Sequence, residues 1–104
     1  MKSHTATKSE QRWMKDINDL GCCVCLKFLR VHTPPEIHHI KGKVKLGSHL
    51  QTIPLCYRHH REGSNNYQYT SRHPWKKSFE DLYGTEAELL EFTKEKIDER
   101  NRSR

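Results

Sequence analysis

Residues 52 to 63 read Thr-Ile-Pro-Leu-Cys-Tyr-Arg-His-His-Arg-Glu-Gly, and the pair Cys56-x-x-His59 inside this stretch has the spacing of two metal ligands. A second pair, Cys22-x-x-Cys25, lies upstream, with thirty residues between Cys25 and Cys56. Two intervening residues let the backbone wrap one metal ion so that both side chains reach it at roughly 2.0 to 2.3 Å, and two such turns complete a tetrahedron. The spacing therefore predicts a structural zinc ion bound by Cys22, Cys25, Cys56 and His59.

Cysteines at this spacing have two other common uses, in disulfides and in redox chemistry. No apolar segment with a cleavage site precedes them, so we expect no secretory route and reduced thiols. A redox Cys-x-x-Cys motif would need a βαβ context, which this sequence does not indicate. Cys23 is left over, and we interpret it as a small buried residue.

Length and composition limit the apolar core that this chain can build. It has 104 residues, of which 33% are hydrophobic and 31% are charged. We expect one domain with a small core, for which a bound metal ion is a natural supplement. No apolar run approaches the roughly 18 residues that span a bilayer, so we expect a soluble protein without a membrane partner.

The positive charge is concentrated in the first part of the chain. The formal net charge is +6, and residues 85 to 104 carry five Lys or Arg against six Asp or Glu. Residues 1 to 84 therefore carry 14 basic against seven acidic side chains. This excess suits a polyanionic partner, although surface lysines also serve solubility.

Hydrophobic periodicity predicts a helix before the first cysteine pair. Apolar residues recur at i, i+4 and i+7 from Trp13, which is typical of an amphipathic helix, here over residues 8 to 20. Thr7 and Glu10 form a capping box at its start, and Gly21 can end it.

Two short strands and further helices are expected downstream. Residues 36 to 40 and 52 to 55 have extended character, and a loop joins them in a predicted hairpin. Residues 57 to 62 can form a short helix that stops at a glycine. The apolar pattern and the capping box Thr85-x-x-Glu88 predict later helices over residues 74 to 83 and 86 to 100. Strands and helices together predict the α+β class.

Four of the eight histidines form two adjacent pairs, His38-His39 and His59-His60. Neighbouring side chains of a strand point to opposite faces, so His38 and His39 should have different roles. With His59 in the zinc site, His60 is available for a second site near the hairpin. The alternative is that these histidines are solvated surface residues.

The order of these elements, Cys-x-x-Cys, then IHHIKG at residues 37 to 42, then TIPLCYRHHREG, resembles the HNH or ββα-metal endonucleases over residues 20 to 65. The stretch FEDLYGTEAELLEF at residues 79 to 92 is similar to the tail of phage Ref-type, RecA-dependent recombination-enhancement nucleases. The resemblance implies an α+β HNH domain with a β-hairpin and a metal-binding helix, braced by a structural zinc and flanked by helices. That single domain over 1–104 would comprise an arm at 1–7, a helix at 8–20, the zinc and HNH core at 22–65 and a helical tail at 74–100.

The resemblance also implies roles for the histidines. It makes His39 the general base that takes a proton from water, and His38 and His60 ligands of a catalytic divalent metal, Mg²⁺ or another. That metal would stabilise the negative charge which phosphodiester hydrolysis builds on the phosphate oxygens.

Two positions depart from the common HNH pattern. The middle asparagine is replaced by Gln51, so the group that orients His39 is Gln51, His49 or a backbone carbonyl, and we rank Gln51 first. The usual ligand four residues after the helix histidine is replaced by Ser64. We favour His73 as the third ligand of the catalytic metal, against Asn65 or water.

The resemblance implies DNA as substrate and a RecA-type recombinase filament as a partner, in the cytoplasm of a bacterial or phage-infected cell. Phosphate contacts are expected from basic residues of the hairpin loop, the metal helix and the start of the tail, with weak sequence preference. These are Lys41, Lys43, Lys45, Arg58, Arg61, Arg72, Lys76 and Lys77. The alternative function is a zinc-containing nucleic-acid-binding module without catalysis. A toxin-like or homing nuclease would use the same cleavage chemistry and differ only in its substrate.

Overall fold

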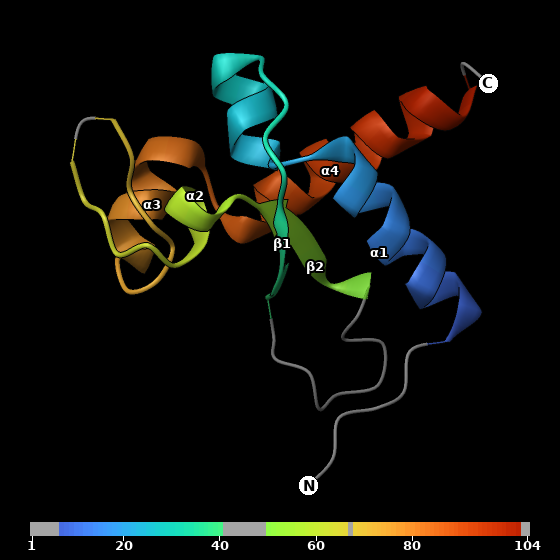
Figure 1. Cartoon of the computed structure of the whole chain (residues 1–104), viewed down its shortest axis with the longest axis horizontal. Coiled ribbons are helices and arrows are strands. Elements are labelled where there is room, and N and C mark those ends of the chain that lie inside the picture. Colours follow the sequence, from blue (N-terminus) through green and yellow to red (C-terminus); the bar gives the residue numbers. More distant parts are fainter. Residues whose placement is uncertain (1–6, 41–49, 67, 103–104) are drawn as a thin grey trace, which may run out of the picture.

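The computed structural model describes residues 7–40, 50–66 and 68–102 and has an α+β architecture. A two-stranded antiparallel sheet lies at the centre, with α1 and α4 packed against it and α2 and α3 to one side (Figure 1). The elements in chain order are α1 (Lys8–Leu20), the π-helical turn η1 (Cys25–Leu29), β1 (Glu36–His39), β2 (Thr52–Leu55), α2 (Tyr57–His60), α3 (Lys76–Tyr83) and α4 (Glu86–Arg102). The predicted α+β class is confirmed.

The hairpin has a simple antiparallel register. Glu36 pairs with Leu55 and His39 pairs with Thr52, and the amide of Ile40 continues the ladder to the carbonyl of Gln51 at 2.9 Å. Both predicted strands are confirmed within one residue. The loop between them, with Lys41, Lys43, Lys45 and His49, lies outside the described residues.

Helix α1 begins and ends where the sequence predicted. The hydroxyl of Thr7 accepts a hydrogen bond from the amide of Glu10 at 3.2 Å, and the Glu10 carboxylate accepts one from the amide of Thr7 at 2.8 Å. Gly21 ends the helix at φ 90°, and a Cβ at that position would lie 2.8 Å from the His32 ring. The indole of Trp13 donates to the hydroxyl of Thr52 at 2.9 Å and fastens α1 to the sheet.

Three element boundaries differ from the prediction. Helix α3 begins at Lys76 instead of residue 74, because the backbone of Trp75, at φ −94° and ψ 51°, is not helical. Helix α2 ends at His60 instead of residue 62, because the backbone of Arg61 leaves the helical region at φ −147° and ψ 9°. Helix α4 begins with the predicted capping box and continues two residues beyond position 100.

The π-helical turn η1 was not predicted. It begins at Cys25 and ends where Arg30 adopts a left-handed conformation, at φ 56°, with its amide donating to the carbonyl of Cys25. A turn with this longer hydrogen-bond spacing has no hydrophobic periodicity of its own in the sequence.

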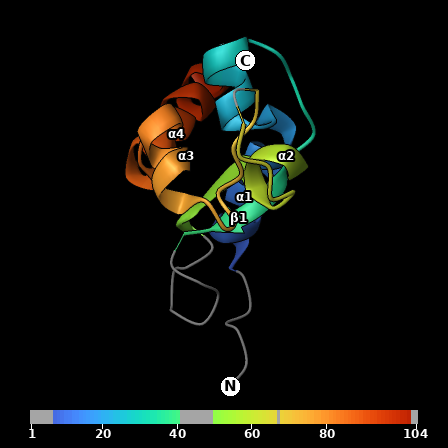
Figure 2. The ribbon, with the colours of Figure 1, turned by 90° about the vertical axis from the view of Figure 1, so that its left-hand side faces the viewer.

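The core is small and lies between the hairpin and the helices. Figure 2 views the molecule from the side of α2 and α3, with the hairpin and α1 behind them. Cysteines contribute a large share of the buried hydrophobic residues in the described part of the chain, which are Ile17, Cys22, Cys23, Val24, Cys25, Ile53, Leu55, Cys56, Phe79, Leu89, Leu90 and Ile97. Among the described residues, no helix is long and apolar enough to cross a membrane.

Candidate metal centres

Two clusters of metal-ligating side chains lie beside the hairpin. The first brings together the four residues that the Cys-x-x-Cys and Cys-x-x-His spacings select. Cys22 and Cys25 lie at the entry to η1, Cys56 caps the N-terminus of α2, and His59 lies within α2. One ligand atom of each residue lies within 4.8 Å of all the others, so the group can hold a metal ion.

The distances within this cluster fit a tetrahedral zinc site. Zinc bonds of ordinary length require about 3.8 Å between two sulfur ligands and about 3.6 Å between a sulfur and a nitrogen ligand. The sulfur atoms of Cys25 and Cys56 are 3.8 Å apart, and Nδ1 of His59 lies 3.6 Å from the Cys25 sulfur and 3.7 Å from the Cys22 sulfur. The distance from Cys56 to His59 is shorter, at 3.2 Å.

The sulfur atoms of this cluster make a cation at this site chemically reasonable. All four ligands are at most 4% exposed, and the amide of Cys25 donates to the sulfur of Cys22 at 3.4 Å. Burial alone would lower the pKa of His59, but contacts with the sulfur atoms of Cys25 and Cys56 outweigh it and raise the pKa to about 9. The cysteine sulfur atoms around His59 therefore favour a positive charge at this position, and a bound zinc ion would supply that charge.

Cys23 is buried next to this cluster but is not one of its members. Burial raises the pKa of its thiol to about 12. Its role as a small buried residue agrees with the sequence interpretation.

The second cluster contains His38 of β1, His60 of α2 and His73, which lies before α3. One nitrogen atom of each ring lies within 4.8 Å of the others. Nδ1 of His38 is 3.3 Å from Nε2 of His60, and the ring of His73 is 5.3 Å, centroid to centroid, from each of the other two. The three imidazoles therefore surround one point.

The segment after α2 folds back and brings His73 to this point. The amide of His73 donates to the carbonyl of His60 at 2.9 Å, and the indole of Trp75 donates to the carbonyl of Gly63 at 2.8 Å. Asn65, the alternative third ligand, and Ser64, which occupies the usual ligand position, both have other hydrogen-bond partners. The hydroxyl of Ser64 donates to Glu62, and the amide oxygen of Asn65 accepts from Thr70.

Two carboxylates contact the outer nitrogen atoms of this cluster. Nδ1 of His60 lies 2.8 Å from an oxygen of Glu36, and Nε2 of His38 contacts an oxygen of Glu86. A carboxylate only accepts hydrogen bonds, so the nitrogen facing it carries the proton and the other nitrogen presents a lone pair. In neutral rings, the two nitrogen atoms that face each other at 3.3 Å both present a lone pair, and a cation between the rings would stabilise this arrangement.

The charges around the cluster follow from these contacts. The guanidinium of Arg61 lowers the pKa of Glu36, and His60 adds to this effect. Burial would raise the pKa of Glu86, but its contacts with His38 and Arg72 outweigh burial and keep the pKa below its usual range. Burial lowers the pKa of His60, which favours the neutral ring that a metal requires.

The sequence predictions did not include either carboxylate. Glu36 lies two residues before His38, on the same face of a strand, so the strand pattern contained a signal for it. Glu86 lies 48 residues after His38, and its place at the start of a helix gives no local indication of this contact.

The predicted general base lies beside the cluster but is not part of it. Directly opposed residues of an antiparallel pair project to the same face, so His39 shares a face with Thr52 and His38 shares the other face with Ile53. The carbonyl of Gln51 accepts from Ile40 at the same end of the hairpin. His38 and His39 therefore project to opposite faces of the hairpin, as the strand geometry predicted, and the role of His39 stays a prediction.

The described basic residues that were predicted to contact phosphate differ in their surroundings. Arg61 pairs with Glu36 at 2.8 Å, and Arg58 stacks over the ring of Tyr69 at 4.8 Å. The Nε of Arg72 lies 3.2 Å from Glu86 but is not aligned for a hydrogen bond, so the contact is an ion pair. Lys76 approaches the same carboxylate at 3.9 Å, and Lys77 lies in the first turn of α3.

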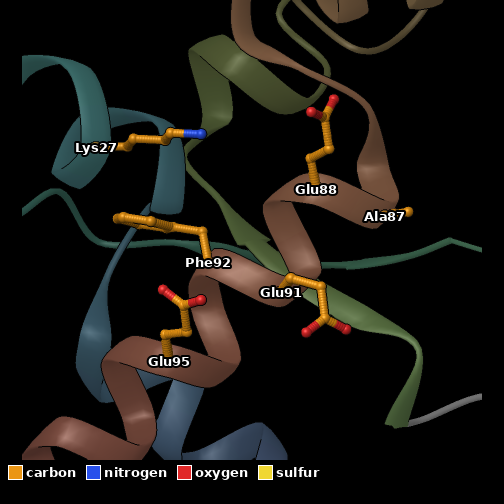
Figure 3. A pocket seen from close by; sticks show the side chains of 6 residues that line it. All are labelled: Lys27, Ala87, Glu88, Glu91, Phe92 and Glu95. Atoms are coloured by element: carbon orange, nitrogen blue, oxygen red, sulfur yellow. The ribbon is translucent and has the colours of Figure 1, made fainter.

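A pocket of about 510 Å³ lies between η1 and α4, and none of its lining residues belongs to either cluster (Figure 3). Lys27 reaches over the ring of Phe92 at 5.5 Å, and three glutamates of α4 form the remaining polar lining. None of the predicted site residues lines this pocket in the part of the chain that the structure describes. The histidine cluster therefore stays the candidate functional site.

Fold and clusters define a small α+β protein in which a β-hairpin and the following helix carry two candidate metal centres. A model of the family described as recombination enhancement, RecA-dependent nuclease, matches residues 6–98. The chain belongs to this family of nucleases. The match extends over α1, the hairpin, α2, α3 and most of α4. A comparison with curated proteins finds no match.

Proposed function

We propose that the protein is a metal-dependent DNA endonuclease of the HNH, or ββα-metal, type that acts in recombination. Its family is described as RecA-dependent nucleases, and the strands β1 and β2 are followed directly by the helix α2, the element order that gives the ββα fold its name. The observation that carries the proposal is the convergence of His38, His60 and His73 on one point. The HNH resemblance assigned His38 and His60 to the catalytic metal, and His73 was favoured as its third ligand.

In this proposal the two centres have separate tasks. Zinc at Cys22, Cys25, Cys56 and His59 would brace the start of α2, because the next residue, His60, belongs to the histidine cluster. His38, His60 and His73 would hold the catalytic divalent ion. When bound, that ion would supply positive charge for the phosphate oxygens of the transition state.

In this proposal, His39 removes the proton from the attacking water. Its neutral imidazole would accept a proton from water while the water oxygen forms a bond to phosphorus. The bond from phosphorus to the leaving sugar oxygen breaks with its electron pair, and that oxygen takes a proton from solvent. Gln51 or His49 would orient the His39 ring for this step, with Gln51 placed at the same end of the hairpin through its backbone contact with Ile40.

The chemical type of the ligand atoms indicates which metal ion would support cleavage. Three imidazoles suit Zn²⁺, Ni²⁺ or Fe²⁺, whereas Mg²⁺ prefers oxygen ligands. In the proposed site the described ligand atoms are all nitrogen. We therefore expect a transition metal ion to support cleavage at lower concentrations than Mg²⁺.

DNA would be bound through phosphate contacts. Of the described basic residues, Arg72 has a side chain only 15% exposed and paired with Glu86, so Arg58 and Lys77 are expected to contribute more. Replacing a phosphate-contacting arginine should reduce the salt dependence of binding by about one unit of slope. Arg58→Ala should show this change and Arg72→Met should not.

The experiment that tests the proposal is a cleavage assay with His39→Ala as the matched variant. Zinc-loaded protein is incubated with plasmid or single-stranded DNA and Mn²⁺ or Mg²⁺, with and without a RecA-type filament. We expect cleavage by the wild type and loss of at least about 100-fold in rate for His39→Ala, the usual contribution of a general base. Equal rates would reject His39 as the base, and DNA binding without cleavage under every condition would favour the non-catalytic module.

A further inference from the structure

We propose that Glu86, the first residue of α4, is a positioning residue for the catalytic metal site, and that Glu36 has the same role with smaller effect. This inference rests on the proposed function, because it assumes that His38, His60 and His73 hold a divalent metal. The proposed metal ligands lie in β1, in α2 and, for His73, in the segment before α3. The inference adds helix α4 to the site through Glu86.

Each of the two carboxylates contacts the ring nitrogen that does not face the other histidine. Glu86 contacts Nε2 of His38, and Glu36 contacts Nδ1 of His60 at 2.8 Å. In each ring the remaining nitrogen points to the centre of the cluster, where Nδ1 of His38 and Nε2 of His60 are 3.3 Å apart. A histidine that ligates a metal commonly donates its other N–H to a carboxylate, which fixes the tautomer and the orientation of the ring.

Glu86 is held more rigidly than an ordinary surface glutamate. Its side chain is 7% exposed, and it forms ion pairs with Arg72 at 3.2 Å and Lys76 at 3.9 Å. Its carboxylate also lies in the first turn of the long helix α4, where the helix dipole favours negative charge. A buried and charge-compensated carboxylate of this kind restricts the His38 ring to one orientation.

Glu36 is placed less firmly. Its side chain is 31% exposed, and its other partner, Arg61, has a side chain 59% exposed. Solvent screens interactions between such exposed groups, so they contribute less than buried contacts. We therefore expect the loss of Glu86 to weaken metal binding more than the loss of Glu36.

The same carboxylate joins the metal site to two basic residues. Arg72 and Lys76, both predicted to contact phosphate, share Glu86 with His38. Removal of the Glu86 charge would leave Arg72 and Lys76 without this partner, and the His38 ring would no longer be held in one orientation. The affinity for metal should therefore fall even where the affinity for DNA does not. That divergence separates positioning from a general loss of folding.

The test uses protein that holds one zinc ion per chain, enough to fill the cysteine site alone, and Co²⁺ as the probe. Cobalt bound by imidazoles gives weak visible bands, whereas cobalt in the cysteine site would also show an intense sulfur-to-metal charge-transfer band, so the two sites are distinguished in one spectrum. The variants are Glu86→Gln, Glu36→Gln and, as a matched control on α4, Glu91→Gln, whose side chain is 70% exposed. The thermal midpoint of every variant is measured alongside.

We expect Glu86→Gln to weaken Co²⁺ binding about 10- to 100-fold, Glu36→Gln to weaken it less, and Glu91→Gln to leave it unchanged. In a His38→Ala background, Glu86→Gln should cause no further loss, because its effect passes through that ring. Glu86→Asp keeps the charge on a shorter side chain and should give an intermediate affinity, which provides a second variant if the amide impairs folding.

Two outcomes would overturn the inference, and they are distinguishable. If Glu86→Gln and Glu86→Asp bind Co²⁺ as tightly as the wild type, Glu86 does not position His38, while the proposed catalytic site stands. If the wild type binds no cobalt outside the cysteine site, the histidine cluster is not a metal site and the proposed function fails with it.

Discussion

Replacement of a single thiol ligand should unfold most of this domain. In Cys25→Ser the predicted zinc site loses one of four ligands, which join the segment after α1 to the segment between β2 and α2. Structural zinc contributes roughly 10 to 16 kcal/mol in small peptides, and ordinary domains are stable by about 5 to 15 kcal/mol in total. Loss of most of the zinc term is therefore comparable with the whole stability of the domain.

The composition of the core supports this magnitude. Of the twelve buried hydrophobic residues in the described part of the chain, three are thiol ligands of the cluster. Without a metal these sulfur atoms and the His59 ring remain buried with no water to solvate them. The apolar remainder is too small to compensate for such a loss.

Cys23 provides a matched control, since it is as buried as the ligands but lies outside the cluster. Cys23→Ala should cost about 1 kcal/mol, the usual scale of a small core truncation, and should retain the zinc. The assay is circular dichroism with thermal unfolding, together with the zinc content after dialysis. A fully folded Cys25→Ser protein without zinc would refute the reasoning, as would equal losses of stability in Cys25→Ser and Cys23→Ala.

Three further results are expected. In zinc-loaded protein, His73→Ala should weaken divalent metal binding at the histidine cluster, measured by calorimetry, whereas Asn65→Ala should not; the opposite order would assign the third ligand to Asn65. Trp13→Phe should lower the free energy of unfolding by about 1 kcal/mol, because it removes the hydrogen bond to Thr52, and an unchanged urea midpoint would contradict this. Burial raises the pKa of Cys23 to about 12, so its thiol stays protonated at pH 9, and iodoacetamide followed by mass spectrometry should leave it unmodified until the protein is denatured.

Local sequence patterns predicted the elements that local chemistry controls. The capping box of Thr7 and Glu10 is formed as predicted, and the paired Cys-x-x spacings selected four side chains that converge in space. The capping box depends on residues three positions apart. The cysteine and histidine pairs depend on the two-residue spacing that lets both side chains of a pair reach one metal ion. Boundaries set by single backbone angles, as at Trp75 and Arg61, were missed by two residues.

The surroundings of the histidine cluster depend on long-range packing. The contact between His38 and Glu86 requires α4 to pack against the hairpin with its first turn near β1, and no local sequence pattern predicts that placement. Likewise, His73 reaches the cluster through backbone hydrogen bonds between its segment and α2. The sequence favoured His73 over Asn65 or water, but no local pattern fixes this contact. Burial of Arg72 follows from the same packing.

We propose that one chain holds two metal ions in two chemically distinct centres. Anomalous diffraction from crystals of protein with one zinc ion per chain, grown with Co²⁺, tests this directly, because data on both sides of each absorption edge identify each metal. We predict zinc within about 2.3 Å of the three cluster sulfur atoms, and cobalt within about 2.2 Å of one nitrogen each of His38, His60 and His73. A single peak at the cysteines, with no density between the three imidazoles, would contradict the account.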